Sequence, residues 1–498
     1  MAETVFSTKF AYTGRHWRRV AWLETIIVYR RNGEKEKQLK KLLTGLAIAL
    51  LLMALTACLD LINTYTLTYD ANGADSGTVP APQVQTRGEY VEMAMNTGNL
   101  AKAGYEFGGW SESADGSDHL YTAGETYDID QVFDLTLYAY WTHFYQVTFD
   151  ANQATGGTVP DSSQVMSEAL YELPLNSGGL IRDGYTFMGW NTKADGTDFT
   201  YAVGQSVNVT AAITYYASWG QHYESATIGT LICVPRGRFQ RDSGAENISV
   251  ISNPYRISRY EITRAQFLDV VGGDPSDTAA SSGDSDPVQR TNLYHIITFC
   301  NKLSLREGLT PVYAVSGINF STLAYASIPT ADNTTWNSAV VNWAANGYRL
   351  PSEMEWMWAA MGATHGFGFS GLAYTSGYAR AFAGSTGSNA IGDYVWYGEN
   401  STTTTHPVGG KLANELGLHD MSGNVYEYCW DRSSSDADNP GYTMTGWLHD
   451  YHGDTSTTNR VMRSGCFSSS VSSVTIAERG FPGAYSMLNV LGFRVARN

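Results

Sequence analysis

This chain of 498 residues has few charged side chains, few cysteines and no long hydrophobic run. Charged residues make up only 16% of it, compared with about 25% in an average globular protein. Acidic residues outnumber basic ones by 48 to 32. Because phosphate binding requires clustered cations, no nucleic-acid partner is expected. Five cysteines are also too few to form a disulfide framework in a chain of this length.

What the chain does contain is glycine, tyrosine and a good share of apolar residues. There are 50 glycines and 32 tyrosines, and 43% of the residues are hydrophobic. This composition is typical of β-rich, turn-rich globular modules and unlike that of a helical bundle or a disordered chain. The length allows two to four domains, with enough apolar surface for a core in each.

The N-terminal region differs in charge from the rest of the chain. Residues 1–57 hold 10 of the 32 Lys and Arg but only 4 of the 48 Asp and Glu. Residues 58–498 therefore contain 22 basic and 44 acidic residues. Four lysines between positions 35 and 41 precede an apolar run of 14 residues at 42–55. That run is too short to cross ~30 Å of hydrocarbon at ~1.5 Å per residue. It indicates a signal peptide, with a short transmembrane or core helix as the alternative.

The end of this run, Leu55-Thr-Ala-Cys58, resembles the lipobox of bacterial lipoproteins. The resemblance implies that residues 1–57 are an N-terminal extension and lipoprotein signal peptide, and that Cys58 is the lipidated first residue of the mature chain. Attachment to the membrane through a lipid anchor predicts an outward-facing protein of the bacterial cell envelope. The 34 residues before the lysine-rich segment fit no standard signal, and a start codon annotated too far upstream would explain them.

A repeat with an offset of 80 residues follows the signal segment. Gly104-Tyr-Glu-Phe-Gly-Gly-Trp110 matches Gly184-Tyr-Thr-Phe-Met-Gly-Trp190, and an Asp-Gly-x-Asp turn follows in each copy. Alternating Tyr, Val, Thr and Phe between such turns predict short strands. The copies resemble the Listeria–Bacteroides repeat of bacterial surface proteins, which implies two small β-grasp-like modules at residues 64–142 and 144–220. We expect them to act as a spacer, followed by a short polar junction at residues 220–226.

The remaining half of the chain mixes short strands with a few helices. Apolar spacing predicts helices at residues 292–307 and 351–362, and Thr263 is a candidate N-cap of an earlier helix. The intervening sequence is rich in Gly, Ser, Thr and Asn. These features predict an α+β domain with long irregular stretches.

Three sequence blocks in this half, in their order, resemble the formylglycine-generating-enzyme (sulfatase-modifying factor) family. They are Tyr348-Arg-Leu-Pro-Ser-Glu-Met-Glu-Trp356, Gly417-Leu-His-Asp-Met-Ser-Gly-Asn-Val-Tyr-Glu-Tyr428 and Gly492-Phe-Arg494. The resemblance covers residues 227–498 and implies a variant of the C-type lectin fold. It also implies an enzyme that oxidises a sulfatase cysteine to formylglycine with two cysteines, copper and oxygen.

The positions that the resemblance assigns to the two catalytic cysteines hold other residues. The family's Arg-Gly-Gly-Ser-aromatic motif reads Arg463-Ser-Gly-Cys-Phe467, and counting onward places the pair at Ser469 and Val474. A hydroxyl and an isopropyl group cannot replace thiolates that bind Cu(I). We therefore assign no catalytic residue and expect no copper, and a formylglycine-generating oxidase is kept as the alternative function. The sequence leaves open whether Cys429 and Cys466 pair.

The second block implies a calcium site. In the family a calcium ion is held near this loop by oxygen ligands, and the matching positions are Asp420, Gly423, Val425 and Glu427. Carboxylate and carbonyl oxygens suit Ca²⁺. The alternative is that the two carboxylates satisfy backbone donors in a buried loop, and the sequence does not decide between them.

The tail between Phe467 and Gly492 suggests a binding surface. It lies between intact family motifs, has no clear periodicity, and resembles the variable proteins of diversity-generating retroelements. Small Ser and Gly residues with scattered aromatics form adaptable contact surfaces. This predicts non-catalytic binding or display of an unknown protein or glycan ligand, and a drifted loop in an ordinary paralogue is the alternative. The candidate ligand-binding residues are Ser468, Ser469, Ser470, Ser472, Ser473, Phe481, Tyr485 and Asn489.

Overall fold

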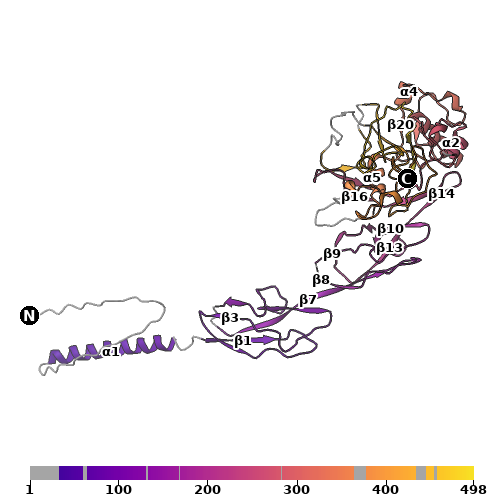
Figure 1. Ribbon diagram of the computed structural model, residues 1–498. Helices are drawn as coiled ribbons and strands as arrows, with labels where there is room; N and C mark the ends of the chain where they lie inside the picture. Colours follow the sequence, from indigo (N-terminus) through magenta and orange to yellow (C-terminus); the bar gives the residue numbers. More distant parts are fainter. Residues whose placement is uncertain are drawn as a thin grey trace, which may run out of the picture. The chain divides into compact units, whose positions relative to one another are not determined.

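The computed structural model describes most of the chain and divides it into two compact units (Figure 1). One unit comprises Met1–Ala103 and Phe107–Trp141, and the other comprises Gly104–Glu106 and Thr142–Asn498. Each unit is described by itself below. The described residues are 33–59, 64–129, 133–167, 169–281, 283–363, 377–432, 445–453 and 457–498.

The predicted signal segment is helical. Helix α1 spans Gly33–Leu59 and contains the whole apolar run. Leu42, Leu46 and Leu50 are among its exposed side chains. No helix in the described part of the chain combines the length and the apolar character needed to span a bilayer. The side chain of Cys58 lies outside the described residues, so its lipidation stays a prediction.

The first unit contains the first sequence repeat as a β module. Its central strand β1 pairs with β2 in an antiparallel manner and with the first part of β7 in a parallel manner, while β3 pairs with β6. Trp110 is fully buried beside Tyr69 at a ring distance of 4.5 Å, and its indole donates to the carbonyl of Ala94 (2.7 Å). The strands are β1 (Thr64–Asp70), β2 (Gln83–Thr86), β3 (Tyr90–Glu92), β4 (Tyr105–Ser111), β5 (Leu120–Tyr121), β6 (Thr126–Asp128) and β7 (Leu135–Asp150).

The second repeat, in the other unit, has the same construction. Strand β13 pairs with the second part of β7 in a parallel manner and with β10 in an antiparallel manner. Trp190 is fully buried, and its indole donates to the carbonyl of Pro174 (2.9 Å). The further strands are β8 (Ser163–Met166), β9 (Leu170–Glu172), β10 (Tyr185–Asn191), β11 (Thr200–Tyr201), β12 (Ser206–Asn208) and β13 (Ile213–Gln221).

The glycine before the core tryptophan is required by the close approach of a neighbouring strand. Gly189 has φ +116°, and a Cβ atom there would lie 2.1 Å from the carbonyl oxygen of Tyr201. Gly109 in the first repeat has φ +124° and the same conflict with Tyr121. The pairing register of β10 shifts at this point, as in a β-bulge. The shared Gly-Trp pair of the two repeats therefore encodes a backbone feature.

The C-terminal domain brings distant segments together in small sheets. One sheet has the order β14-β15-β18-β25, so the last residues of the chain pair with the start of the domain, and another has the order β23-β21-β24. The strands are β14 (Tyr223–Ser225), β15 (Gly229–Val234), β16 (Gly237–Gln240), β17 (Ile248–Ile251), β18 (Tyr255–Ser258), β19 (Tyr313–Ala314), β20 (Val340–Val341), β21 (Tyr426–Arg432), β22 (Leu448–His449), β23 (Arg460–Arg463), β24 (Leu491–Gly492) and β25 (Ala496–Arg497).

The helices follow the predicted caps. Thr263 caps α2 and Asn292 caps α3, and each residue forms a capping box. The predicted N-cap at Thr263 and the predicted helix at residues 292–307 are thereby confirmed. Ser352 caps α5, so this helix begins two residues later than its Pro351 suggested. The helices are α2 (Arg264–Val271), α3 (Leu293–Arg306), α4 (Thr334–Asn337) and α5 (Glu353–Ala360), with 3-10 turns at Thr278–Ala280, Tyr325–Ser327, Gly377–Ala379, Ile391–Asp393 and Val471–Ser473.

The expected polar junction at residues 220–226 is mostly strand. Strand β13 continues to Gln221, whose carbonyl accepts from Arg256 Nε (3.1 Å), and β14 follows almost at once. Ser225 is buried, and its hydroxyl donates to Glu307 (2.5 Å). The junction is thus packed against the C-terminal domain, and the second repeat and this domain form one compact unit.

We predict that Gly189→Ala destabilises the second repeat, because the added Cβ cannot coexist with the Tyr201 carbonyl. The expected loss in the free energy of unfolding is about 3 kcal/mol, compared with about 1 kcal/mol for Gly196→Ala. Gly196 is the matched control, since it has φ +71° but open space around its Cβ position. Urea denaturation of the full chain, followed by tryptophan fluorescence, measures both, and equal losses would refute the steric explanation.

Candidate functional site

A buried ion-pair cluster lies beneath the tail of the C-terminal domain. Glu353, the first residue of α5, is fully buried and accepts from Arg463 Nε (2.8 Å) and from Arg479 Nε (2.5 Å) and Nη2 (2.7 Å). Its own backbone N–H donates to Asp431 (2.6 Å). Burial alone would raise the pKa of the Glu353 carboxyl, but the two guanidinium groups outweigh it and lower the pKa to about 2.

A second buried pair joins two of the sequence blocks. Arg494 donates to both oxygens of Glu427, from Nε (2.6 Å) and from Nη2 (2.7 Å), and both side chains are fully buried. The indole of Trp356 adds a third hydrogen bond to Glu427 (2.7 Å). A buried charge of this kind is tolerated only when its partner and the remaining donors are in place.

Residues outside the tail hold its backbone in place. Arg463 donates from Nη1 to the carbonyls of residues 476, 477 and 478 at 3.1–3.3 Å. The hydroxyl of Tyr428 lies 3.1 Å from the carbonyl of Gly483 and 3.2 Å from that of Ser486. The backbone N–H of Arg290 donates to the carbonyl of Leu488 (2.9 Å). The tail is therefore fixed through its main chain.

The side chains of the predicted ligand-binding residues are mostly at the surface. Ser473 and Phe481 are half-buried, and Ser469 is buried because its hydroxyl accepts from the backbone N–H of Cys466 (3.0 Å). Val471 and Leu488, which the sequence analysis did not single out, are 48% and 43% exposed. The exposed members are Ser468, Ser470, Ser472, Tyr485 and Asn489.

The two positions expected for catalytic cysteines have unlike surroundings. Ser469 Oγ lies 3.4 Å from Cys466 Sγ and 3.4 Å from the Tyr426 hydroxyl. Val474 is fully buried in a small apolar cluster with Phe382, Val395 and Tyr397. In the described part of the chain, all four cysteines (Cys233, Cys300, Cys429 and Cys466) are free and buried, so Cys429 and Cys466 do not pair in this structure.

The predicted calcium loop is buried and already rich in internal contacts. Asp420 Oδ2 accepts from the Gly409 N–H (2.7 Å), whereas its buried Oδ1 has no hydrogen-bond partner. The carbonyl of Gly423 accepts from Ser464 Oγ (3.1 Å), and the N–H of Val425 donates to Glu261 (3.1 Å). Glu427, as shown above, is engaged by Arg494 and Trp356. Among the side chains of the predicted ligands, only that of Asp420 presents a buried oxygen without a hydrogen-bond partner.

The carboxylates around this loop share one arginine. Burial raises the pKa values of Glu261 and Asp420, and the charges of neighbouring carboxylates raise that of Glu261 further. Arg494 opposes both shifts. Within the described ranges, no group of three or more His, Cys, Asp or Glu side chains is arranged to hold a metal ion. The excess of carboxylates and the orphaned Asp420 oxygen fit a missing cation, while the engaged Glu427 does not.

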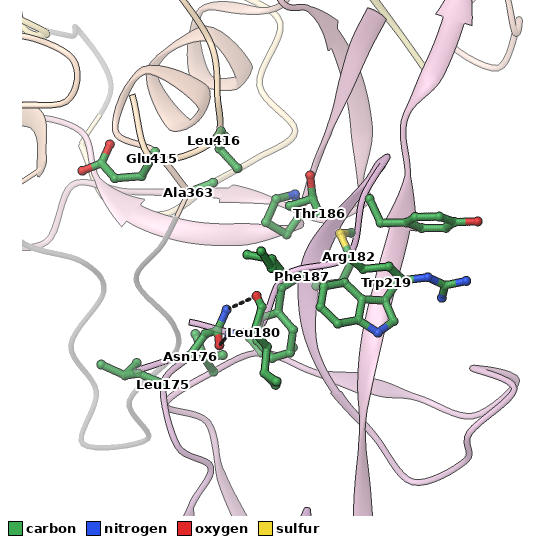
Figure 2. A pocket seen from close by; sticks show the side chains of 18 of the residues that line it. Leu175, Asn176, Leu180, Arg182, Thr186, Phe187, Trp219, Ala363, Glu415 and Leu416 are labelled. Atoms are coloured by element: carbon green, nitrogen blue, oxygen red, sulfur yellow. Dashed lines mark hydrogen bonds between the residues drawn. The ribbon is translucent and has the colours of Figure 1, made fainter. Parts of the chain in front are cut away.

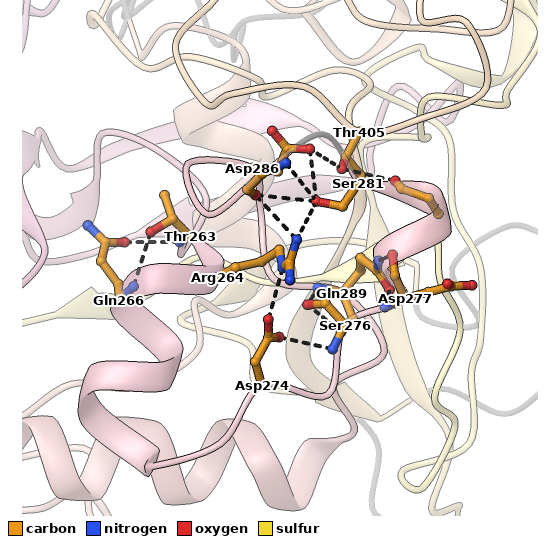
Figure 3. Close-up of polar contacts among 12 residues, drawn as sticks. Thr263, Arg264, Gln266, Asp274, Ser276, Asp277, Ser281, Asp286, Gln289 and Thr405 are labelled. Carbon is orange, nitrogen blue, oxygen red and sulfur yellow. Dashed lines mark hydrogen bonds and ion pairs between the residues drawn. The ribbon is translucent and has the colours of Figure 1, made fainter.

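A polar network fixes the loop that precedes α3 (Figure 3). Arg264 donates to Asp274 (2.9 Å) and to the Ser281 hydroxyl (3.0 Å). The buried Asp286 accepts from Ser281 (3.0 Å) and from Thr405 (2.7 Å). This network ties the irregular residues 274–289 to the distant segment around position 405, so its carboxylates have a structural role.

A cavity of about 510 Å³, which no sequence pattern indicated, lies between the second repeat and the C-terminal domain. Figure 2 shows Phe187 and Trp219 on the repeat side and Leu416 on the domain side. Part of its polar lining is engaged internally, since Asn176 bonds to Leu180 and Arg182 donates to Gln153 (2.8 Å). None of the predicted site residues lines this cavity.

Comparison with known proteins identifies the domain that carries these features. Residues 217–498, more than half of the chain, match the family described as the sulfatase-modifying factor enzyme 1-like domain. The chain belongs to this family. Residues 65–140 and 145–218 match the Listeria–Bacteroides repeat domain. Both resemblances drawn from the sequence blocks are thereby confirmed.

Relatives of the sulfatase-modifying factor domain carry different names. The chaperone protein LppX of Paenibacillus barcinonensis is 33% identical over 275 residues, which is 54% of this chain and 89% of that protein. The formylglycine-generating enzyme of Streptomyces coelicolor is 31% identical over 179 residues, 33% of this chain and about half (52%) of the enzyme. Among solved structures, Treponema denticola variable protein 1 covers 56% of this chain and is itself covered to 98%, with 29% identity and a TM-score of 0.48.

We predict that Glu353→Gln strongly destabilises the sulfatase-modifying factor domain, because Arg463 and Arg479 lose their shared anion. The expected loss is about 3–5 kcal/mol at pH 7. Since the Glu353 pKa is lowered in the folded state, its stabilisation is complete above its ordinary pKa of 4.5 and is lost as the pH falls toward about 2. The difference from wild type should therefore shrink over this pH range.

Urea denaturation of the full chain between pH 7 and pH 2.5 measures this difference. The matched control is Asp269→Asn, which breaks the exposed ion pair with Arg306 and should cost less than about 1 kcal/mol. A Glu353→Gln loss that stays constant across the pH range would contradict the assignment.

Proposed function

We propose that this protein is an envelope-anchored bacterial lipoprotein whose sulfatase-modifying factor domain binds or displays a ligand without catalysis. The contact area is the tail surface, defined as the exposed Ser468, Ser470, Val471, Ser472, Tyr485, Leu488 and Asn489. The observation that carries the proposal is the contrast between a tail backbone held by buried residues and tail side chains that point to solvent.

The composition of the tail surface favours a protein ligand. Tyr485, Val471 and Leu488 expose 46%, 48% and 43% of their areas, so each offers an apolar contact at little cost in the folded state. Serine and asparagine supply adaptable hydrogen bonds, as in paratopes, and partly exposed aromatics commonly become central contacts of interfaces. The relative LppX is named a chaperone protein, which points in the same direction.

Membrane attachment and a spacer complete the proposal. A lipid on Cys58 would place the two repeats between the membrane and the domain. That the two repeats have a β-grasp-like fold is also part of this proposal. The chain after residue 57 carries 22 basic and 44 acidic residues. Such a charge disfavours contact with anionic lipid surfaces, which suits an outward-facing role.

The alternative function is a formylglycine-generating oxidase that modifies a sulfatase cysteine. The 31% identity to the Streptomyces coelicolor enzyme over 179 residues supports it. Ser469 and Val474 argue against it, since neither side chain supplies a thiolate for Cu(I). Val474 is, moreover, fully buried in an apolar cluster with Phe382, Val395 and Tyr397.

Calcium is a secondary part of the proposal, supported by the orphaned Oδ1 of Asp420. The ligands implied by the family resemblance are Asp420, the carbonyls of Gly423 and Val425, and Glu427, which calcium would have to share with Arg494. We predict that 1 mM CaCl₂ stabilises the full chain by ~2.7 kcal/mol if the dissociation constant is about 10 µM. Asp420→Asn should abolish this gain, and 1 mM MgCl₂ serves as the control in thermal denaturation. An unchanged melting temperature would refute the site.

Binding by the tail surface can be tested with a phage-displayed library of random peptides, selected on the immobilised full chain. We predict that Tyr485→Ala with Leu488→Ala weakens the selected peptides at least tenfold, because it removes two exposed apolar contacts. The matched control is Leu412→Ala, which truncates a 56% exposed leucine outside the tail. Peptides that bind both variants equally well, or a selection that yields none, would count against the proposed surface.

A further inference from the structure

A smaller groove lies on the compact unit formed by the second repeat and the C-terminal domain, away from the tail surface. Its volume is about 260 Å³. The repeat contributes an aromatic and an amide side chain. The domain contributes one arginine just before β16, a second arginine within β16, and residues at the end of β17. The lining residues are Phe199, Gln205, Arg236, Arg238, Val250, Ile251 and Ser252.

Arg236 differs from three of the buried arginines of the domain. Arg349, Arg463 and Arg494 each form an ion pair with a glutamate. Among the described residues, no carboxylate forms an ion pair with Arg236; its guanidinium lies over the ring of Phe199 (4.2 Å to the centroid) and donates to the carbonyl of Thr200. Burial lowers the pKa of Arg236, so a partly desolvated cation stands here without an anion.

A second arginine lines the same groove. Arg238 follows Arg236 by two residues, and both side chains line the groove. Its guanidinium lies 5.6 Å from the ring centroid of Trp447. Two arginines beside two aromatic rings therefore mark one groove in a protein whose net charge is −16. A guanidinium that stacks on a ring keeps its planar edge oriented for an oxyanion.

We propose that this groove binds an acidic sugar, meaning a sugar ring that carries a carboxylate or a phosphate group. The oxyanion would pair with Arg236, with Arg238 adding positive charge to the same groove, and the C–H face of the ring would pack on Phe199, whose side chain is 50% exposed. Gln205 and Ser252 supply polar partners for ring hydroxyls. The volume lies slightly below the ~300–1,000 Å³ of pockets for drug-sized ligands, which suits a single sugar residue.

This site is independent of the proposed function of the tail surface. It requires only the contact between the second repeat and the domain, and it gives the repeat a role in recognition, since Phe199 and Gln205 both belong to it. A ligand in this groove would bridge the two and stabilise their contact. Loss of peptide binding at the tail and loss of sugar binding here are therefore separate results.

The test is isothermal titration calorimetry of the full chain with four probes: glucuronate, glucose 6-phosphate, glucose and inorganic phosphate. We expect glucuronate or glucose 6-phosphate to bind at least tenfold more tightly than glucose, which lacks the oxyanion, and than phosphate, which lacks the ring. The first two probes separate a carboxylate ligand from a phosphate ligand. Binding should weaken when NaCl is raised from 50 to 500 mM, since salt screens the partly exposed charges.

Two variants assign the binding to the groove. Arg236→Gln should weaken the preferred acidic sugar at least tenfold, and Ser252→Glu, which adds a negative charge at an exposed position, should do the same while both arginines stay in place. The matched control is Arg182→Gln. Arg182 belongs to the second repeat, and its guanidinium lies 4.0 Å from the ring centroid of Tyr185, but it does not line the groove.

Thermal denaturation of each variant checks that it folds. The proposal is overturned if no acidic probe binds at 10 mM, if glucose binds as well as the acidic sugars, or if Arg182→Gln reduces binding as much as Arg236→Gln. If Arg236→Gln fails to fold, Ser252→Glu decides the matter. Unchanged binding by Ser252→Glu would place the ligand elsewhere.

Discussion

Buried charge holds the C-terminal domain together. Glu353 accepts hydrogen bonds from Arg463 and Arg479, and Glu427 accepts them from Arg494. An unpaired charge in such an interior is costly, so each of these side chains obliges its partners to meet. The three sequence blocks that identify the family contain Glu353, Glu427 and Arg494, which explains why blocks far apart in the chain occur together.

The elements that rest on local physical chemistry were predictable from the sequence. The capped helices α2 and α3 and the repeated Gly-Trp pair depend on neighbours in the chain or on a fixed backbone geometry. The partnership of Glu353 with Arg479 was not predictable, because it joins residues 126 positions apart. The strand content of residues 220–226 was missed for a similar reason, since their polar side chains find distant partners such as Glu307 in the domain.

The candidate site shows the same division. The sequence located the tail between two family motifs, but it could not tell which side chains point outward, because the tail has no regular period. Ser469 turned out to be buried by a local hydrogen bond to Cys466, while Val471 and Leu488 proved to be exposed. The groove and the cavity beside the second repeat depend on the packing of two folded parts against each other, for which no local pattern exists.

The way in which Arg463 and Tyr428 hold the tail has a consequence for its evolution. Both contact main-chain carbonyl oxygens of the tail, which every amino acid provides. Replacement of the exposed side chains therefore leaves these anchoring bonds in place. Selection can act on the shape and polarity of this surface with little penalty in folding, so descendants of this gene can change the surface while keeping their fold.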